Sequence, residues 1–355
     1  MKEGWSIKPF GDCIEKVKAT TKLQSSLYKD SGTYPIVSQE KELISGYWDI
    51  KEDLFCHSTP LVVFGDHTMV VKYIDFDFVV GADGVKILMP KPFLLPKFFY
   101  YWVSSVQIQS RGYARHFRYL KETSVPIPSQ SEQQRIVDIL DAEFAKIDIL
   151  KENAEKNLQN AKDLFQAVLR KELEPKEGWN TIKLGDFAHM KAGDFVKATD
   201  IHENYYEGSY PCYGGNGLRG YVDIPNRNGK FCLIGRQGAL CGNVHIAEGV
   251  FRATEHAVVV TPYDPIPTKL VYYLLLSLNL NQFSTGAAQP GLSVKNIAEN
   301  VLISVPPKDK WTEIEHKLDV LSGNTGLLQY NYASTITLCN DLKQALLRKA
   351  FNVEL

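Results

Sequence analysis

The long stretch at residues 131–173 contains no proline or glycine and constrains the fold of this chain more than any other feature. It is rich in Glu, Lys, Ala, Leu and Gln, and its small or apolar residues recur every seven positions. Such a repeat is typical of a helix that packs along a seam against another helix. The sequence therefore predicts one long helix. Its seam is Leu140, Ile147, Ala154, Ala161 and Val168, with Ile136, Leu150 and Leu164 on the adjoining stripe.

The same pattern returns near the C-terminus, at residues 311–351. The segment that begins at Asp163-Leu164 and ends at Arg170-Lys171 recurs without a gap as Asp341-Leu342 to Arg348-Lys349. The chain thus contains two copies of one helix. Adding 178 to each seam position of the first gives Leu318, Thr325, Tyr332, Cys339 and Leu346 in the second.

The regions before the two helices are also related to each other. Lys2-Glu3-Gly4-Trp5 opens the chain, and Lys176-Glu177-Gly178-Trp179 follows at an offset of 174. Such self-similarity indicates a tandem duplication with the order globule, helix, globule, helix. We expect a first domain at residues 1–128, a spacer helix at 129–174, a second domain at 175–307 and a second spacer helix at 308–355.

Each globule has the pattern of a mixed α and β domain. Short β-branched and aromatic runs between turn residues predict strands at residues 61–64, 69–74, 76–80, 85–88, 231–234 and 257–261. A helix with proline at or near its first turn is expected at 96–108 and again at 267–280. The predicted class is α+β: two tandem globules and two long helices that form an antiparallel coiled coil, with pseudo-two-fold symmetry.

Composition narrows the class of protein without naming its function. The chain has 355 residues, 44% of them apolar, and a formal net charge of −1, which excludes neither nucleic acid nor protein partners. No apolar stretch is long enough to span a bilayer, so we expect a cytoplasmic protein without a membrane partner. The six cysteines form no CxxC pair, so neither a disulfide framework nor a metal site is predicted.

Motifs of catalysis are missing from the sequence. Gly215-Asn216-Gly217-Leu218-Arg219-Gly220 fits the dinucleotide pattern GxGxxG, but turn residues follow it where a helix would be needed. There is no phosphate-binding GxxxxGK[ST] loop, no GxSxG elbow and no HExxH helix. We therefore predict no catalytic residue, no metal and no cofactor on this chain.

The informative chemistry is a charge pattern in the first globule. Residues 84–121 contain no Asp or Glu, and basic and aromatic residues alternate near the end of this segment. Arg and Lys neutralise phosphates, and Arg also binds guanine. The alternative is a solvated basic face; we favour DNA binding. The candidates are Lys86, Lys91, Lys97, Arg111, Tyr113, Arg115, His116, Arg118 and Lys121.

The second globule has a sparser set of DNA-binding candidates. Loops with glycines and amides, at residues 214–217 and 286–291, could approach base edges, although each alone is also consistent with an ordinary turn. If each globule reads a few base pairs of DNA, the two half-sites should differ in sequence, because the two globules differ. The length of the helices would then set the number of base pairs between the half-sites that neither globule reads. The candidates are Lys197, Asn216, Arg219, Arg227, Lys230, Arg236, Gln237, Arg252, Gln289 and Lys295.

Several motifs give the chain a resemblance to the specificity subunit of type I restriction-modification enzymes. The paired openings Gly4 to Asp12 and Gly178 to Asp186 contribute to it, as does Val125-Pro126-Ile127-Pro128 before Glu132-Gln133. The second copy departs from that junction with Lys310-Trp311-Thr312-Glu313. The other motifs are Phe64-Gly65-Asp66-His67-Thr68, residues 75–84, Ile234-Gly235-Arg236-Gln237-Gly238 and Ala253-Thr254-Glu255-His256.

The resemblance implies two target-recognition domains that read a bipartite, asymmetric double-stranded DNA sequence. It also implies helices that dock two methyltransferase subunits, with a restriction subunit as a further partner. S-adenosylmethionine, Mg and ATP would then be bound by the partner subunits only. Repeated charges at helix ends are candidate docking residues, although they also stabilise a helix C-terminus. They are Arg170, Lys171, Arg348 and Lys349.

Two other classes of function stay open. A self-sufficient methyltransferase or nuclease would have to bind the methyl donor or cut DNA without a partner, and the missing motifs argue against it. A scaffold protein would use the same helices and globules to bind other proteins without DNA.

Overall fold

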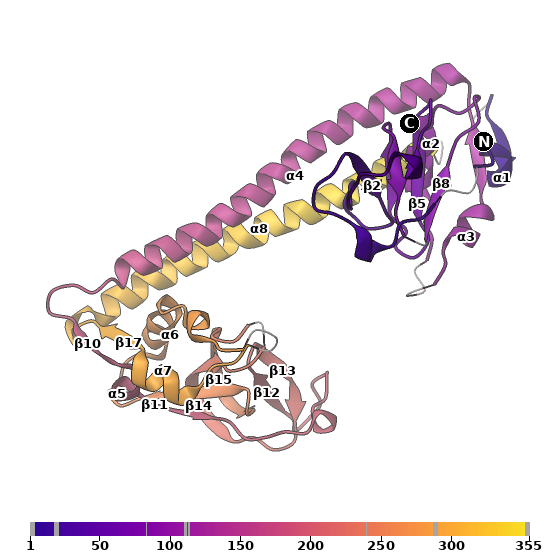
Figure 1. The fold of residues 1–355 in the computed structure, drawn as a ribbon. Helices are drawn as coiled ribbons and strands as arrows, with labels where there is room; N and C mark the ends of the chain where they lie inside the picture. Colours follow the sequence, from indigo (N-terminus) through magenta and orange to yellow (C-terminus); the bar gives the residue numbers. More distant parts are fainter. Residues whose placement is uncertain are drawn as a thin grey trace. The chain divides into compact units, whose positions relative to one another are not determined.

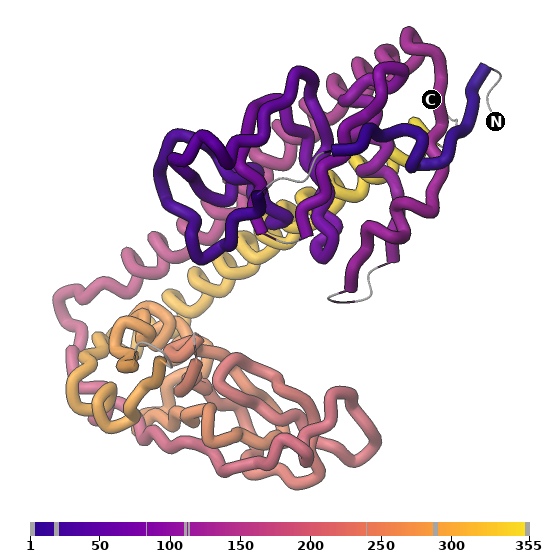
Figure 2. Tube along the Cα trace, turned by 45° about the vertical axis from the view of Figure 1, so that its right-hand side comes forward, coloured from indigo at the N-terminus to yellow at the C-terminus, as the bar shows by residue number. Residues whose placement is uncertain are grey.

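The computed structural model describes residues 4–17, 21–82, 84–109, 112, 114–238, 240–286 and 290–351. The chain divides into two compact units, Met1–Glu155 with Ser334–Leu355, and Lys156–Ala333. The boundary falls inside both long helices, so each unit contains one globule and a part of each helix. Both ends of the described chain lie in the first unit (Figure 2).

The two predicted helices are confirmed, and their limits lie within one residue of the stretches 131–173 and 311–351. They are α4 (Gln130–Glu172) and α8 (Trp311–Phe351), which lie side by side in each unit (Figure 1). In the first unit Lys151 binds Asn340 at 3.0 Å and Lys343 pairs with Asp148 at 2.5 Å. In the second unit Lys317 pairs with Glu172 at 2.7 Å. Early residues of one helix meet late residues of the other, so the pairing is antiparallel.

The predicted seam is buried, but its adjoining stripe is not. Leu150 and Leu164 are 52% and 50% exposed, and only Ile136 of that stripe is buried. A pair of helices buries a narrower stripe than a helix on a globular core does, so residues beside the seam stay exposed. The buried seam residues are Leu140, Ile147, Ala154, Ala161, Leu318, Thr325 and Cys339; Val168, Tyr332 and Leu346 are half-buried.

The globule of the first unit contains three small sheets. A four-stranded sheet has the order β3-β2-β7-β4, and a three-stranded antiparallel sheet has the order β6-β5-β8. Strand β6 begins later than predicted, because Met69 has a φ of 58° and lies in the turn before it. The elements are β1 (Ser6–Pro9), α1 (Phe10–Cys13), β2 (Tyr34–Val37), β3 (Gly46–Trp48), β4 (Leu54–Phe55), β5 (Leu61–Gly65), β6 (Val71–Ile74), β7 (Phe78–Val80), β8 (Val85–Leu88), α2 (Pro96–Ser105), α3 (Phe117–Lys121) and β9 (Ser124–Ile127), which pairs with β1.

The globule of the second unit is built around one six-stranded sheet. Its order is β11-β16-β14-β15-β12-β13, and β10 pairs separately with β17. The elements are β10 (Asn180–Lys183), α5 (Leu184–Phe187), β11 (Ala188–Ala192), β12 (Tyr210–Gly214), β13 (Gly217–Val222), β14 (Arg227–Gly235), β15 (Val244–Ala253), β16 (Ala257–Pro262), α6 (Thr268–Ser277), α7 (Val294–Asn300) and β17 (Leu302–Val305).

The two globules share parts of their strand pairing, as the duplication predicts, although the first divides its strands between separate sheets and the second joins six strands in one. In each, one pair of strands is parallel: Ile36 lies opposite Val79 in the first, and Cys212 lies opposite Arg252 in the second. The strand that opens each globule pairs antiparallel with the strand that closes it. The α+β class and the tandem arrangement of globule and helix are therefore confirmed.

The sequence predicts neither a metal site nor a membrane-spanning segment. Within the described ranges, no group of three or more His, Cys, Asp or Glu side chains could hold a metal ion. The helices within the same ranges include none with the length and apolar character needed to cross a bilayer.

Candidate nucleic-acid interface

A basic and aromatic cluster lies on the first unit, around α3. The ring of Phe117 has two ammonium groups over it, those of Lys121 at 5.1 Å and Lys86 at 5.8 Å from its centroid. Arg118 stacks on Tyr119 at 4.6 Å. Arg115, Arg118 and Lys121 are exposed. The alternation of basic and aromatic residues thus gives two exposed cations that flank aromatic rings, with the exposed Arg115 close by in the sequence, an arrangement suited to phosphates and bases.

The buried carboxylate of Asp66 holds this cluster in place. Its Oδ1 accepts a hydrogen bond from the backbone N–H of Phe117 at 2.8 Å, and its backbone carbonyl accepts one from His116 at 2.7 Å. Its Oδ2 lies 3.4 Å from Nζ of Lys86. Residues 84–121 contain no acidic residue, but in the folded chain Asp66 lies beside them. Its carboxylate therefore partly compensates the positive charge of Lys86.

Some predicted contact residues of the first unit lie elsewhere. His116 is fully buried, and its Nδ1 lies 3.1 Å from the carbonyl of Asp66, so it positions the segment and is not at the surface. Lys97 pairs with Asp141 at 2.8 Å, and Lys91 is half-buried. Arg111 and Tyr113 lie outside the described residues, as does Gln289 of the second unit.

A cleft of about 450 Å³ lies on the second unit. The turn between β12 and β13 forms one side of it, and Gln237-Gly238 and His256 form the other. Three of the predicted residues, Asn216, Arg219 and Gln237, line this cleft, and all three are exposed. The structure thus brings together residues from two segments about twenty positions apart in the sequence.

Glycines allow the two sides of the cleft to approach so closely. A Cβ atom on Gly235 would lie 2.1 Å from the carbonyl oxygen of Gly215, and one on Gly215 would lie 3.0 Å from that of His256. Gly217 has a φ of 97°, which favours glycine. Backbone therefore packs on backbone here, and the polar side chains of the turn are left at the rim.

The other candidates of the second unit do not join this cleft. Lys230 pairs with Glu248 at 2.9 Å, and Lys295 lies 3.9 Å from Glu299. Arg227 donates to its neighbour's backbone at 2.7 Å. Arg252 binds the carbonyls of Ile224 and Phe195 at 3.2 Å each, beside the exposed Lys197. Arg236 is half-buried, and its backbone N–H and carbonyl bind His256 and Leu292.

His256 is a member of the cleft that was not among the predicted contact residues. It belongs to the motif Ala253-Thr254-Glu255-His256, which contributed to the family resemblance and could have identified it. Its Nε2 lies 3.2 Å from Oε1 of Glu255.

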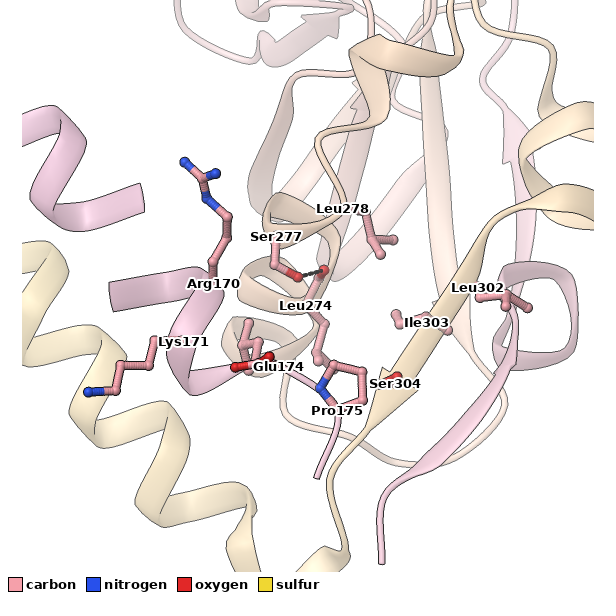
Figure 3. Close-up of a pocket in the computed structure, with 11 residues that line it drawn as sticks. Arg170, Lys171, Glu174, Pro175, Leu274, Ser277, Leu278, Leu302, Ile303 and Ser304 are labelled. Atoms are coloured by element: carbon pink, nitrogen blue, oxygen red, sulfur yellow. Dashed lines mark hydrogen bonds between the residues drawn. The ribbon is translucent and has the colours of Figure 1, made fainter. Parts of the chain in front are cut away.

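The candidate docking residues of the helices are exposed. Arg170 and Lys171 line a pocket of about 450 Å³ at the end of α4. Their side chains extend away from Leu274, Leu278 and Ile303, which line its apolar part (Figure 3). Arg348 and Lys349, at the equivalent positions of α8, are exposed as well.

Comparison with known proteins identifies the family. Residues 2–160 and 176–336 each match the family described as the type I restriction modification DNA specificity domain. The chain belongs to this family. The two matches to the specificity domain coincide with the two copies found by self-comparison, and together they cover most of the chain.

Curated members of the specificity family match over shorter segments. The type I restriction enzyme EcoprrI specificity subunit of Escherichia coli is 40% identical over 171 residues, 48% of this chain and 40% of that subunit. The EcoR124I/EcoR124II specificity subunit of Escherichia coli is 27% identical over 222 residues, 57% of this chain and 53% of that subunit. These matches span about half the length of the relatives.

A solved structure shows the same fold over the whole length. It is described as the structural basis underlying complex assembly and conformational transition of the type I R-M system. One of its chains superposes with a TM-score of 0.71 at 17% identity, over 99% of both chains.

Proposed function

We propose that this chain is the DNA-binding specificity subunit of a type I restriction-modification complex. It reads a bipartite, asymmetric target in double-stranded DNA, with one globule for each half-site. Its helices dock two methyltransferase subunits, with or without a restriction subunit. Membership of the specificity family supports this proposal, and the surface of each globule supports it independently.

One observation carries the proposal: the globules have related strand pairings but differ in surface chemistry. The first exposes Arg118 and Lys121 beside aromatic rings, together with Arg115, whereas the second has a cleft lined by Arg219 and amide side chains. A common scaffold with different polar groups is what two different half-sites require, because base-edge contacts determine sequence.

Apolar side chains on the long helices support the docking part of the proposal. In the second unit, Val320 and Leu327 are 48% and 61% exposed, and their spacing of seven places them on one face of α8. The buried Leu318 and Thr325 lie on the opposite face. An exposed apolar helix face of this kind fits an apolar face on a partner helix.

Catalysis belongs to the partners in this proposal. This chain selects the DNA sequence. The methyltransferase subunits bind S-adenosylmethionine and transfer the methyl group, and Mg and ATP are bound by partner subunits as well. The lack of catalytic motifs in the sequence supports this division.

A gel-shift series tests the proposal. The purified chain, alone and with its methyltransferase subunit, is titrated against a pool of random-sequence duplexes, and the bound DNA is sequenced. We expect enrichment of one split sequence with a constant gap. If neither state prefers any split sequence, the proposal is wrong. Methyl-donor binding or DNA cleavage by the isolated chain would instead favour an enzyme.

A further inference from the structure

We propose that the cleft of the second unit reads a guanine in the second half-site, and that Arg219 and Asn216 set this preference. The cleft is the one between the β12–β13 turn, Gln237-Gly238 and His256. This inference rests on the proposed function, because it assigns a base to one of the two globules.

The side chains at the rim present hydrogen-bond donors. The guanidinium group of Arg219 makes no hydrogen bond or ion pair with another described residue. The Oδ1 of Asn216 accepts a hydrogen bond from Asn243 at 3.1 Å, so its amide N–H groups are left as donors. Guanine presents two acceptors, N7 and O6, in the major groove, and Arg is the side chain that most often binds both.

The position of Arg219 is restricted by the turn. Its Cδ atom lies 3.6 Å from the place where a Cβ on Gly214 would be, so the aliphatic part of the side chain packs across that glycine. An arginine whose stem is packed loses less conformational freedom on binding than one that extends freely into water. This favours a specific contact over diffuse charge attraction.

Unsatisfied buried polar groups lie at His256, which lines the cleft, and at the two residues before it. Oγ1 of Thr254, Oε2 of Glu255 and Nδ1 of His256 are buried and make no hydrogen bond with any described residue. Thr254 is fully buried, and its Oγ1 lies 3.9 Å from the Cβ position of Gly214, directly behind the cleft. Buried polar groups are normally paired in proteins. The unpaired ring nitrogen of His256 is the one of these groups that belongs to a residue lining the cleft, and it supports a polar ligand there.

The first globule differs from the second beside this cleft. At an offset of 176, Gln39 takes the place of Gly215. The Oε1 atom of Gln39 accepts a hydrogen bond from the backbone N–H of His67 at 3.2 Å and lies 2.5 Å from the Cβ position of Gly84. The first globule thus has a glutamine side chain where the second has backbone packed on backbone, so the two globules differ at this point of the proposed reading site.

A base edge fits the cleft better than a phosphate does. Arg219 is the only Lys or Arg among the described residues that line it, and the other polar side chains are amides and His256. Phosphate sites depend on several cations or on clusters of backbone N–H groups, whereas amides and a single arginine are typical of base recognition.

Two substitutions at one position separate base reading from charge. The complex of this chain with its methyltransferase subunits selects from a pool of random-sequence duplexes. With Arg219→Ala, we expect the preference for guanine at one position of one half-site to fall about ten- to a hundredfold. With Arg219→Lys, the overall affinity should be retained and the same preference lost, because lysine lacks the planar fork. The other half-site should not change in either variant.

Lys191→Ala provides the matched control. Lys191 is exposed on β11, at the opposite edge of the same sheet, and its substitution should leave the selected sequence as it is in the wild type. The inference is wrong if Arg219→Ala selects the wild-type sequence with full preference, if affinity falls equally for all sequences, or if the relaxed position is not a guanine. If the wild-type complex selects no split sequence, the proposed function itself fails, which is a different result.

Discussion

The hydroxyl group of Tyr273 donates a hydrogen bond to Oδ1 of Asp319 at 2.7 Å. Lys269, one turn earlier in α6, lies 2.5 Å from Oδ2 of the same carboxylate. These three residues fix the helix of the second globule to α8. We call this set the clamp of the second unit.

The first unit contains the same clamp between α2 and α4. Tyr101 donates a hydrogen bond to Asp141, and Lys97 lies 2.8 Å from that carboxylate. Lys97 and Tyr101 correspond to Lys269 and Tyr273 at an offset of 172. Asp141 corresponds to Asp319 at an offset of 178, which is also the offset between the two long helices. The duplication therefore preserves the contact that joins each globule to a long helix.

The clamp predicts a pH-dependent contribution to stability. Burial acts to raise the pKa of Asp319, but the hydrogen bonds from Lys269 and Tyr273 outweigh it, and the pKa is lowered in the folded chain. The stability that results is present above the unfolded pKa of about 3.9 and is lost as the pH falls through the lower folded value. Asp319→Asn should lower the free energy of unfolding by about 1 to 3 kcal/mol at pH 7 and by less below pH 4.

Chemical denaturation of the wild type and this variant at both pH values measures the difference. Tyr263→Phe, at a tyrosine that is 65% exposed in the same unit, should not alter the unfolding free energy. An Asp319→Asn effect of the same size at both pH values would contradict the role of the carboxylate charge.

Gln133 predicts a larger loss of stability. It is fully buried at the start of α4, where its Oε1 accepts from Leu95 at 2.8 Å and its Nε2 donates to Phe93 at 2.9 Å and to Pro128 at 3.1 Å. Gln133→Ala would leave these buried backbone groups unpaired, so we expect a loss of about 2 to 4 kcal/mol. Thermal unfolding measures it.

The neighbouring Gln134 is the control for this change. It is exposed and donates only to Asp138, one turn later, at 2.7 Å, so Gln134→Ala should cost less than about 0.5 kcal/mol. Equal effects of the two substitutions would mean that the buried network does not stabilise the junction.

The second copy of this junction shows why its sequence could differ. Adding 178 to Gln133 gives Trp311, and its Nε1 donates to the carbonyl of Pro306 at 2.8 Å. Pro306 is in turn the equivalent of Pro128. A different side chain therefore makes the same hydrogen bond to the same backbone position, and the departure from the first copy preserves this contact.

The elements that depend on local pattern could be predicted from the sequence. The limits of α4 follow from the absence of proline and glycine and from the repeat of seven, and those of α8 follow from its gapless likeness to α4. The strands follow from short β-branched runs. The partial compensation of the Lys86 charge by Asp66 could not be predicted from the sequence, because these two residues, far apart in the sequence, meet only in the folded sheet. The cleft at Asn216 and Gln237 also depends on such a meeting, although the residues themselves were candidates.

Charge removal on the first unit should weaken DNA binding without changing sequence preference in the second half-site. Arg115→Ala with Arg118→Ala removes two exposed cations near Phe117. We expect a weaker affinity and a salt dependence whose log-log slope is smaller by about 0.9 for each phosphate that the variant no longer neutralises. Titrations at several salt concentrations measure both values.

A double substitution at Lys41 and Lys51 matches the charge removed by this change. Both lysines are exposed in the same unit and outside the basic cluster. Their replacement by alanine should leave the slope close to that of the wild type. An unaltered affinity and slope in the Arg115 and Arg118 variant would place the phosphate contacts elsewhere.

The exposed face of α8 should be needed for assembly and not for folding. Val320→Ser with Leu327→Ser replaces two exposed apolar side chains, so the midpoint of unfolding should change little. Recovery of the methyltransferase subunit with the tagged chain should fall, since apolar area is removed from the proposed interface. Val250→Ser, at a residue 40% exposed on β15, is the control. Full recovery of the partner with the α8 variant would exclude this face as the docking surface.

Mapping of DNA methylation in cells with and without this chain tests the central claim most directly. The methyltransferase subunit is present in both, so that only the specificity component differs. The account predicts a split, asymmetric sequence, with two different half-sites and a constant gap, that is methylated only when the chain is made. The same methylated sequences in both cells would contradict it.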